Sequence, residues 1–282
     1  MRFGAFLLAP RYPKQDVGTP LDASLAAAVA AEDAGFDDVW IAEHHFMSYG
    51  VCPSAVTMAG FLLGATRRIT VGTAVSVLST QHPVALAEQA ALLDRLSGGR
   101  FVLGVGRGGP WVELDVFGTG LERWERGYPA ALDALLAALR SGRVRDPPCT
   151  GQLADDLELV PRSRGDLPVI TAVTSEDGLR TAADRGLPML LGMLADDEEK
   201  AALIADLLCR LPPVGSPGHC VRTLAATAHR TGVEHLILMV ETTGELARTL
   251  ETISRLGAEV LPRLRRQPAV ADTDDTAPAT GS

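Results

Sequence analysis

The chain has 282 residues, 46% of them apolar and 22% charged, and its 26 Lys plus Arg against 35 Asp plus Glu give a formal net charge of −9. This acidic balance argues against binding to nucleic acid or to an anionic membrane surface, because each phosphate contact needs a Lys or Arg. No run reaches about 18 unbroken apolar residues, and the N-terminus lacks a cleavage signal, so we expect a cytoplasmic protein.

The length allows either two domains or one α/β barrel of about 250 residues. The last stretch, 267–282, is small, polar and without periodicity, which predicts a disordered C-terminal tail. We therefore expect a single domain over residues 1–266. The four cysteines are scattered and form no CxxC pair, which favours reduced thiols over disulfides or a zinc site.

Seven short apolar or β-branched runs predict strands along the chain. Most of them precede a longer stretch with helical spacing, and this alternation is typical of a parallel sheet covered by helices. The predicted strands are Arg2–Leu8, Asp37–Ala42, Ile69–Val77, Phe101–Val105, Pro168–Val173, Pro188–Leu194 and His235–Glu241.

The helices between these strands carry start and stop signals. Thr19, followed by a proline, is predicted to be the N-cap of a helix that runs to Ala34. Thr174 with Asp177 three residues later predicts a capping box for a helix that ends at Arg185.

Three further stretches complete the prediction. An acidic run precedes Ala201–Arg210, as at a helix N-terminus. Ser141–Asp166 is rich in Pro, Arg, Asp and Gly, which predicts a long surface loop with a short edge strand around Leu157–Val160. Pro53–Ala65 is apolar nearly all round, so this helix either forms a subunit contact or is covered by loops of its own chain.

Glu43, His44 and His45 directly follow the second predicted strand. Functional groups of a parallel barrel gather where strands end, so this cluster is either catalytic or a packed group. Adjacent residues of a strand point to opposite faces, and the two histidines are therefore not expected to share one ligand. A metal hydrolase would need more ligands, and only His82 is a further histidine near this end.

A glycine-rich run, Gly104 to Gly109, follows the strand FVLGV. Its glycines formally match a dinucleotide fingerprint, but Pro110 and Trp111 follow where a helix should open, which argues against that reading. The glycines would let a ligand approach the backbone, and Arg107 would offer a planar fork for a phosphate. The alternative is a glycine turn with a solvated arginine.

Two weaker signals lie nearby in the predicted barrel. Thr174 and Ser175 open a helix, whose free N–H groups either bind an anion or are simply capped. Small residues at 72–75 end the third strand and leave room for a flat ligand on the backbone.

Taken together, these stretches resemble the bacterial luciferase-like flavin-dependent monooxygenases, in particular the luciferase α-subunit. The resemblance rests on FGAFLLAP, GFDDVWIAEHHF, GTAVSVLSTQHPVALAEQAALLDRLSGGRFVLGVGRG, PVITAVTSEDGLRTAADRGLPM and VGSPGHCVRTLAATAHRTGVEHLILMVE. It implies a TIM-like (β/α) barrel, usually dimeric. It also implies that reduced FMN binds at the C-terminal strand ends and reacts with O₂ to give a C4a-(hydro)peroxyflavin.

The resemblance assigns roles to individual residues. His44 falls on the active-site histidine that acts as acid or base near the flavin. Arg107 falls on the phosphate-binding arginine, and Thr174 and Ser175 fall on the phosphate loop.

Three further positions would contact the flavin ring. Ala74 and Val75 match the pair joined by a non-prolyl cis peptide bond under the isoalloxazine. Gly106 stands where the luciferase α-subunit has a reactive cysteine, which makes light emission less expected.

A deletion is the largest departure from the family. Relatives have another strand, its helix and an active-site loop before the motif that begins at Val214, whereas Leu211, Pro212 and Pro213 bridge directly here. The barrel is therefore expected to be incomplete or seven-stranded. Water must then be excluded from the site by another segment, either 110–120 or 141–166.

These observations predict a two-component monooxygenase that receives reduced FMN from a separate flavin reductase and oxygenates a small apolar organic substrate. We expect a homodimer and no metal. Two alternatives stay open: an F420-dependent oxidoreductase, and a non-catalytic flavin-binding protein or partner subunit. Trp40, Trp111 and Phe46 are candidates to flank the substrate, and the arginine-rich composition suggests specialised metabolism.

Overall fold

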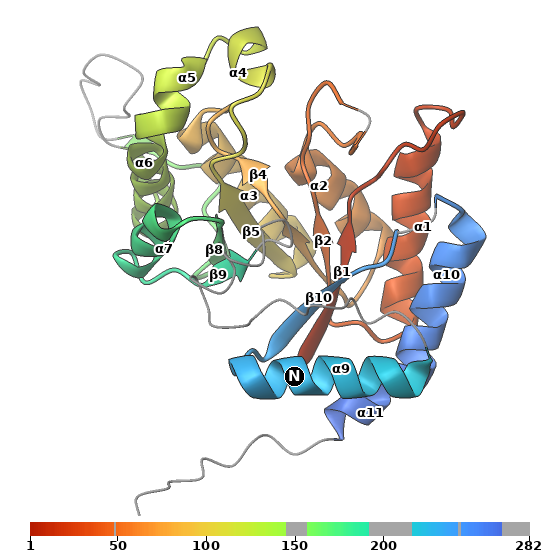
Figure 1. Cartoon of the computed structure of the whole chain (residues 1–282). Helices are drawn as coiled ribbons and strands as arrows, with labels where there is room; N and C mark the ends of the chain where they lie inside the picture. The colour runs from red at the N-terminus through yellow and green to blue at the C-terminus, as the bar shows by residue number, and fades with distance from the viewer. Residues whose placement is uncertain (48, 145–156, 192–215, 242–243, 267–282) are drawn as a thin grey trace, which may run out of the picture.

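A parallel sheet curls around the centre of the molecule and forms an incomplete barrel with helices on its outside (Figure 1). The computed structural model describes residues 1–47, 49–144, 157–191, 216–241 and 244–266. The strand order is β10-β1-β2-β3-β5-β8-β9, and β4 pairs with β5. The predicted barrel is thus confirmed in its incomplete form. The strands are β1 (Arg2–Leu7), β2 (Asp38–Ile41), β3 (Thr70–Thr73), β4 (Ser76–Val77), β5 (Phe101–Gly106), β8 (Val169–Val173), β9 (Met189–Leu191) and β10 (His235–Met239).

The helices pack on the outer face of the sheet, and Figure 1 shows the longest of the C-terminal ones, α9, lying across the end where β1 begins. Two π-helical turns, η1 (Arg123–Gly127) and η2 (Leu256–Val260), continue directly into α6 and α11. The helices are α1 (Thr19–Asp33), α2 (Ala55–Ala65), α3 (Pro83–Ser97), α4 (Glu113–Val116), α5 (Gly120–Glu122), α6 (Tyr128–Ser141), α7 (Glu176–Ala183), α9 (Pro217–Thr231), α10 (Leu246–Arg255) and α11 (Leu261–Arg265).

The main core lies between the sheet and these helices. Alternate residues of the strands point outward into it, and Phe3, Ala5, Phe101 and Leu103 are fully buried there. Burial of this apolar surface is what holds the helices on the sheet. None of the described helices is long and apolar enough to span a bilayer.

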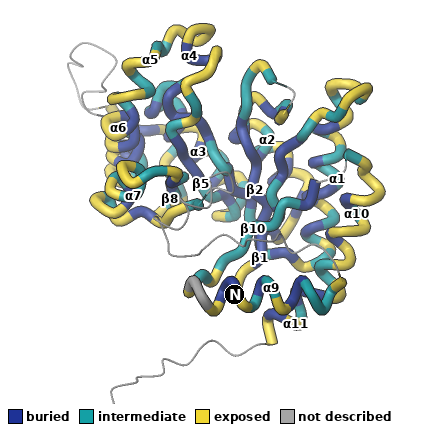
Figure 2. The backbone as a smooth tube through the Cα atoms, in the orientation of Figure 1, coloured by how far each residue is buried: buried dark blue, intermediate teal, exposed yellow. Residues whose placement is uncertain are grey.

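The two strands at the ends of the sheet, β9 and β10, are less buried than the central ones, as Figure 2 shows for β10. All five residues of β10 are partly exposed, whereas every residue of β2 is buried. Several predictions lie outside the described residues: the helix over 201–210, the deletion before Val214 and the disordered tail after residue 266.

The predicted strand Ile69–Val77 is divided into β3 and β4. Ala74 and Val75 interrupt it, and the peptide bond between them is cis, as the family resemblance implied. The predicted edge strand near Leu157 is also present: β7 (Leu157–Glu158) pairs antiparallel with β6 (Arg143–Val144).

Two cap assignments were wrong by one residue. The N-cap of α1 is Gly18, and Thr19 is the first helical residue. The N-cap of α7 is Ser175, whose Oγ accepts from the Gly178 N–H at 3.2 Å, while Thr174 stays in the exposed loop before it. A helix boundary read from sequence shifts easily when neighbouring residues are both good caps.

Helix α2 is not covered on all sides by its own chain. Ala55, Ala59 and Leu62 are fully buried against the sheet and neighbouring helices, but 62% of Phe61 is exposed. The sequence left two explanations for this apolar helix, a subunit contact or coverage by loops of the same chain. Phe61 is not covered by loops of its own chain.

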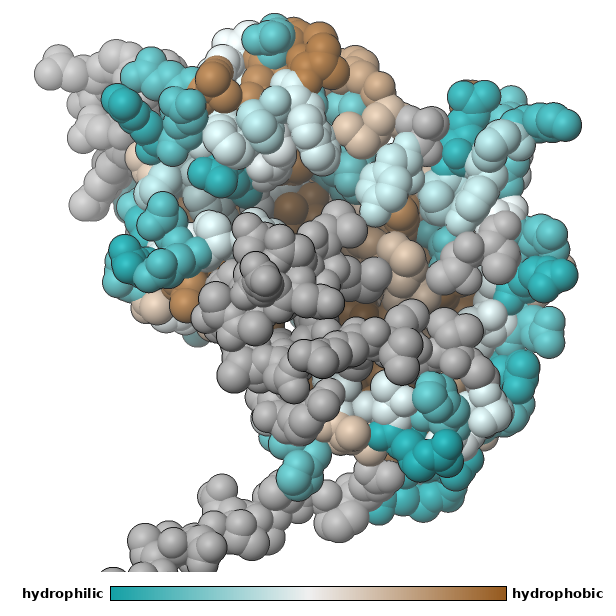
Figure 3. Space-filling view, in the orientation of Figure 1, coloured by the Kyte–Doolittle hydropathy of each residue, from teal (hydrophilic) through white to brown (hydrophobic). Residues whose placement is uncertain are grey.

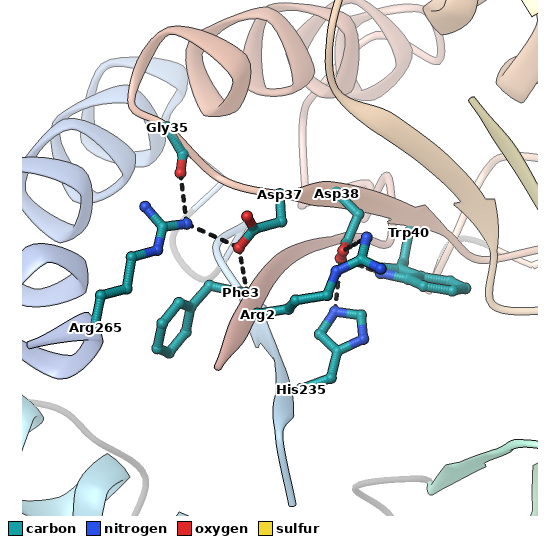
Figure 4. Close-up of polar contacts among 8 residues, drawn as sticks. All are labelled: Arg2, Phe3, Gly35, Asp37, Asp38, Trp40, His235 and Arg265. Carbon is teal, nitrogen blue, oxygen red and sulfur yellow. Dashed lines mark hydrogen bonds and ion pairs between the residues drawn. The ribbon is translucent and has the colours of Figure 1, made fainter. Parts of the chain in front are cut away.

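Paired polar groups close the end of the barrel where the strands begin (Figure 4). The fully buried Asp38 accepts from Trp40 Nε1 at 2.5 Å, from His235 Nε2 at 2.8 Å and from Arg2 Nη2 at 3.0 Å. Next to it, Arg265 Nη2 donates to Asp37 Oδ2 at 2.8 Å. These contacts join β10, β1 and β2 to the last described helix.

Candidate active site

Glu43 ties together the segments that follow the C-terminal ends of β2, β3 and β5. Its buried carboxylate accepts from the Ala55 N–H at the start of α2 and from the Val77 N–H of β4, both at 2.9 Å. Val77 is in turn paired with Gly106 at the end of β5. The residues after three strands are thereby held at one end of the barrel.

His44 lies in this group as a neutral imidazole. Burial lowers its pKa from the usual value of 6.5, and Glu43 only partly opposes this effect. Its backbone N–H donates to the Cys52 carbonyl at 2.9 Å, while its Nδ1 is buried and has no hydrogen-bond partner among the described residues. A buried polar atom of this kind is unusual and is typical of a functional site.

The two histidines contact different aromatic residues. The His44 ring lies 5.3 Å from the Tyr49 ring, edge to face, and 6.4 Å from that of Trp111, with planes 23° apart. The His45 ring lies 5.0 Å from Phe117, and its Nε2 is 3.7 Å from Glu43 Oε1. As expected, they are not arranged to share one ligand.

Small residues line the barrel next to this group. A Cβ at Gly106 would lie 2.5 Å from Val75 Cγ2 and 3.5 Å from the Ala172 Cβ, so any side chain there would displace Val75. The Ala74 N–H donates to the Ile41 carbonyl at 2.7 Å, which fixes the segment against β2. Ala74, Val75 and Gly106 thus lie together.

Arg107 follows Gly106 and is half-buried. Its Cζ lies 4.0 Å from the centroid of the Trp124 ring, and Trp124 Nε1 donates to the Gly108 carbonyl at 2.8 Å. The guanidinium makes no ion pair with an Asp or Glu within the described ranges. A stacked cation without an acidic partner is suited to an anionic ligand.

Thr174 and Ser175 leave the neighbouring strand at the same end. β5 and β8 are paired, with Val105 opposite Thr171, so Arg107 and Thr174 follow adjacent strand ends. The first turn of α7 has free N–H groups, but Glu176 and Asp177 in that turn oppose an anion. Arg107 is therefore needed to make this edge attractive to a phosphate.

The sequence did not reveal several residues of the site. Trp124 stacks on Arg107, and the Tyr128 hydroxyl is 2.6 Å from Thr171 Oγ1, with burial raising the pKa of Tyr128. No spacing rule connects these residues to β5 or β8. His82, in contrast, caps α3 by accepting from the Val84 N–H.

The described residues contain no cluster of three His, Cys, Asp or Glu side chains that would hold a metal ion. The cysteines among them, Cys52 and Cys220, are both buried. Burial raises the pKa of Cys52 to about 11, so its thiol is protonated.

Comparison with known proteins gives a consistent family. The family model for luciferase-like monooxygenases matches residues 1–210. The alkanal monooxygenase alpha chain of Photorhabdus luminescens is 34% identical over 212 residues, which are 72% of this chain and 56% of that protein. The chain thus spans a little over half the length of this relative.

Solved structures with the same fold include two enzyme types. The oxygenating constituent of 3,6-diketocamphane monooxygenase from Pseudomonas putida, in complex with FMN, has a TM-score of 0.70 at 16% identity, covering 93% of this chain and 98% of that one. The F420-dependent tetrahydromethanopterin reductase of Methanopyrus kandleri has a TM-score of 0.65 at 18% identity, covering 93% and 99%. At these identities the likeness shows the fold alone. From the match over residues 1–210, the chain belongs to the luciferase-like monooxygenase family.

Proposed function

We propose that this chain is a flavin-dependent monooxygenase that uses reduced FMN and O₂ to oxygenate a small apolar substrate. One observation carries the proposal. A half-buried cation without an acidic partner in the described residues, Arg107, lies at the same end of the barrel as His44, whose buried Nδ1 is unpartnered. Small residues at 74, 106 and 172 lie between adjacent strand ends there.

The donor set suits FMN. Arg107 would bind the phosphate, together with the hydroxyls of Thr174 and Ser175 and the first turn of α7. Ala74, Val75 and Gly106 would provide a flat surface for the ring. When bound, reduced FMN would supply the electrons with which O₂ is activated.

His44 would hold or move a proton at the reacting end of the site. Because burial lowers its pKa, the imidazole is neutral near pH 7 and can accept a proton, which the imidazolium so formed can return in a later step. Glu43 would act as a positioning residue, since it precedes His44 in the chain and its hydrogen bonds fix this segment to Ala55 and Val77.

The segment 110–120 would exclude water from the site. Trp111 and Phe117 already contact the rings of His44 and His45, and both belong to this segment. These contacts support the stretch after β5 for this role; residues 145–156 of the other stretch lie outside the described residues.

The cofactor is tested by titrating the purified chain with FMN and with F420. Arg107→Ala should weaken FMN binding at least about tenfold, because a charge-assisted phosphate contact is lost. Arg248→Ala, an exposed arginine on α10 paired with Glu245, is the matched control and should leave binding unchanged. Tight F420 binding without FMN binding would refute the choice of FMN.

The reaction is tested by supplying FMNH₂ and O₂ and measuring product formation and oxygen uptake. His44→Ala should lower turnover by about 10²-fold or more while FMN binding changes less than twofold. NADH alone should not reduce the bound FMN, whereas adding a flavin reductase should. Bound flavin without oxygen uptake above that of free flavin would instead indicate a non-catalytic flavin-binding protein.

We also propose that two copies associate through α2 and α3. These helices pack together at Gly60 and Leu93, and their outer sides expose Phe61, Leu92 and Leu96 by 62%, 45% and 77%. Apolar side chains exposed at this level favour a subunit contact. Leu96→Asp should convert a dimer to a monomer in sedimentation analysis, and an unchanged dimer would exclude this face.

A further inference from the structure

Four aromatic side chains near His44 and His45 are exposed. We call Phe46, Tyr49, Trp111 and Phe117 the aromatic rim; they are 62%, 49%, 50% and 44% exposed. Two follow β2 and two follow β5. Figure 3 shows apolar surface gathered over α4 and α5, beside a recess whose base is also apolar. Exposed apolar side chains gathered at one place usually mark a binding site.

The rim joins two segments that are far apart in the chain. The rings of Phe46 and Phe117 are 5.7 Å apart and tilted by 42°. Trp111 lies nearly parallel to His44, and Phe117 lies edge to face with His45. The rings are thus ordered around the two histidines while about half of their surface stays in contact with solvent.

Phe46 is difficult to explain by stability alone. Its φ is +58°, a left-handed conformation that is unfavourable for a bulky residue. Because 62% of the residue is exposed, burial offsets little of this cost. A phenylalanine held in this way is better explained by contact with a ligand.

We propose that the rim binds a planar aromatic substrate, with one ring of the substrate against Trp111 and its edge toward His44. That the bound ligand is a substrate rests on the proposed oxygenase function. The rim presents ring faces and edges rather than the branched chains that suit an aliphatic ligand. Its rings also lie against the imidazoles of His44 and His45, so a ring bound on the rim would lie close to the proposed proton-transfer residue.

The test compares two ligands of the same carbon number, a naphthol and decanol, by equilibrium dialysis against the purified chain. Trp111→Leu keeps an apolar side chain but removes the flat ring. It should weaken naphthol binding about tenfold and decanol binding less than twofold, because stacking is lost while apolar contact is kept. Leu157→Ala, half-exposed on β7, is the control and should change neither.

Phe46→Leu provides a second variant if Trp111→Leu does not fold. Like Trp111→Leu, it should weaken naphthol binding more than decanol binding. Equal weakening of both ligands, or no change, would overturn the proposal. So would a loss of dimer in sedimentation analysis of either rim variant, because the rim would then be a subunit contact.

The outcome is independent of the flavin test. If naphthol binding depends on Trp111 but FMN does not bind, the proposed oxygenase function fails and the aromatic site remains. If FMN binds and depends on Arg107 while Trp111→Leu leaves naphthol binding unchanged, the aromatic site fails and the flavin function remains.

Discussion

The two ends of the barrel differ in how completely their buried polar side chains are hydrogen-bonded. Where the strands begin, the buried Asp38 accepts three hydrogen bonds (Figure 4). Past the C-terminal ends of β2, β3 and β5, five buried side-chain atoms have no partner in the described part of the chain: His44 Nδ1, His45 Nε2, Ser76 Oγ, Ser79 Oγ and Glu113 Oε2. The first end is built for stability, and the second leaves groups available for a ligand.

Asp38→Ala should cause the largest loss of stability. It leaves the buried Trp40 N–H and the His235 imidazole without their acceptor, so the free energy of unfolding in urea should fall by about 3 kcal/mol. Arg2→Ala is the control, because the Arg2 side chain is 56% exposed and should cost less than about 1 kcal/mol. Equal losses in the two variants would mean that the cluster does not stabilise this end.

Glu43→Ala should have the next largest effect, because Glu43 is a buried and well-paired carboxylate at the ligand-binding end. The backbone N–H groups of Ala55 and Val77 would lose their acceptor, which costs about 2 kcal/mol. Glu43→Gln retains one carbonyl oxygen and should cost about half as much in the same unfolding measurement. If Glu43→Ala left the free energy of unfolding unchanged, water would have to replace the carboxylate as acceptor.

His44→Leu should change the free energy of unfolding by less than about 1 kcal/mol. Its Nδ1 has no partner to lose among the described residues, and an apolar side chain avoids burying that atom. His235→Leu, which breaks the bond to Asp38, should destabilise by about 2 kcal/mol. If His44→Leu proved the more harmful of the two, the contrast between the ends would be wrong.

The pH dependence of stability gives the smallest effect. The folded-state pKa of His44 lies below its usual value of 6.5, so the unfolded chain binds more protons at mildly acidic pH. Stability should therefore fall as pH drops below about 6.5, and the fall should be shallower in His44→Leu. If the free energy of unfolding fell equally between pH 7 and pH 5 in the unmodified chain and in His44→Leu, the lowered pKa of His44 would be contradicted.

The sequence predicted elements better than contacts between them. All seven predicted strands are present, because apolar runs between helical stretches depend on local composition. The break at Ala74 and Val75 divides one of these runs, and no feature of composition marks it without the family resemblance.

At the site, the sequence and the resemblance identified His44, Arg107, Thr174 and Ser175 as candidates. Neither of them predicted that Trp124 stacks on Arg107 or that the rings of Phe46 and Phe117 lie side by side. Those contacts join loops that follow different strands, and their geometry depends on how the whole sheet curls. The identity of a side chain is local information, whereas its neighbours across a barrel are not.

The pairing of β1 with β10 has a consequence for synthesis. Arg2 to Phe6 lie in register with His235 to Met239, so one edge of the first strand has its partner at the far end of the chain. A ribosome adds roughly 5–20 residues per second, so that edge waits about ten seconds or longer for its partner. During this time an open strand edge is exposed to other nascent chains, and a chaperone that shields it would raise the yield of native protein.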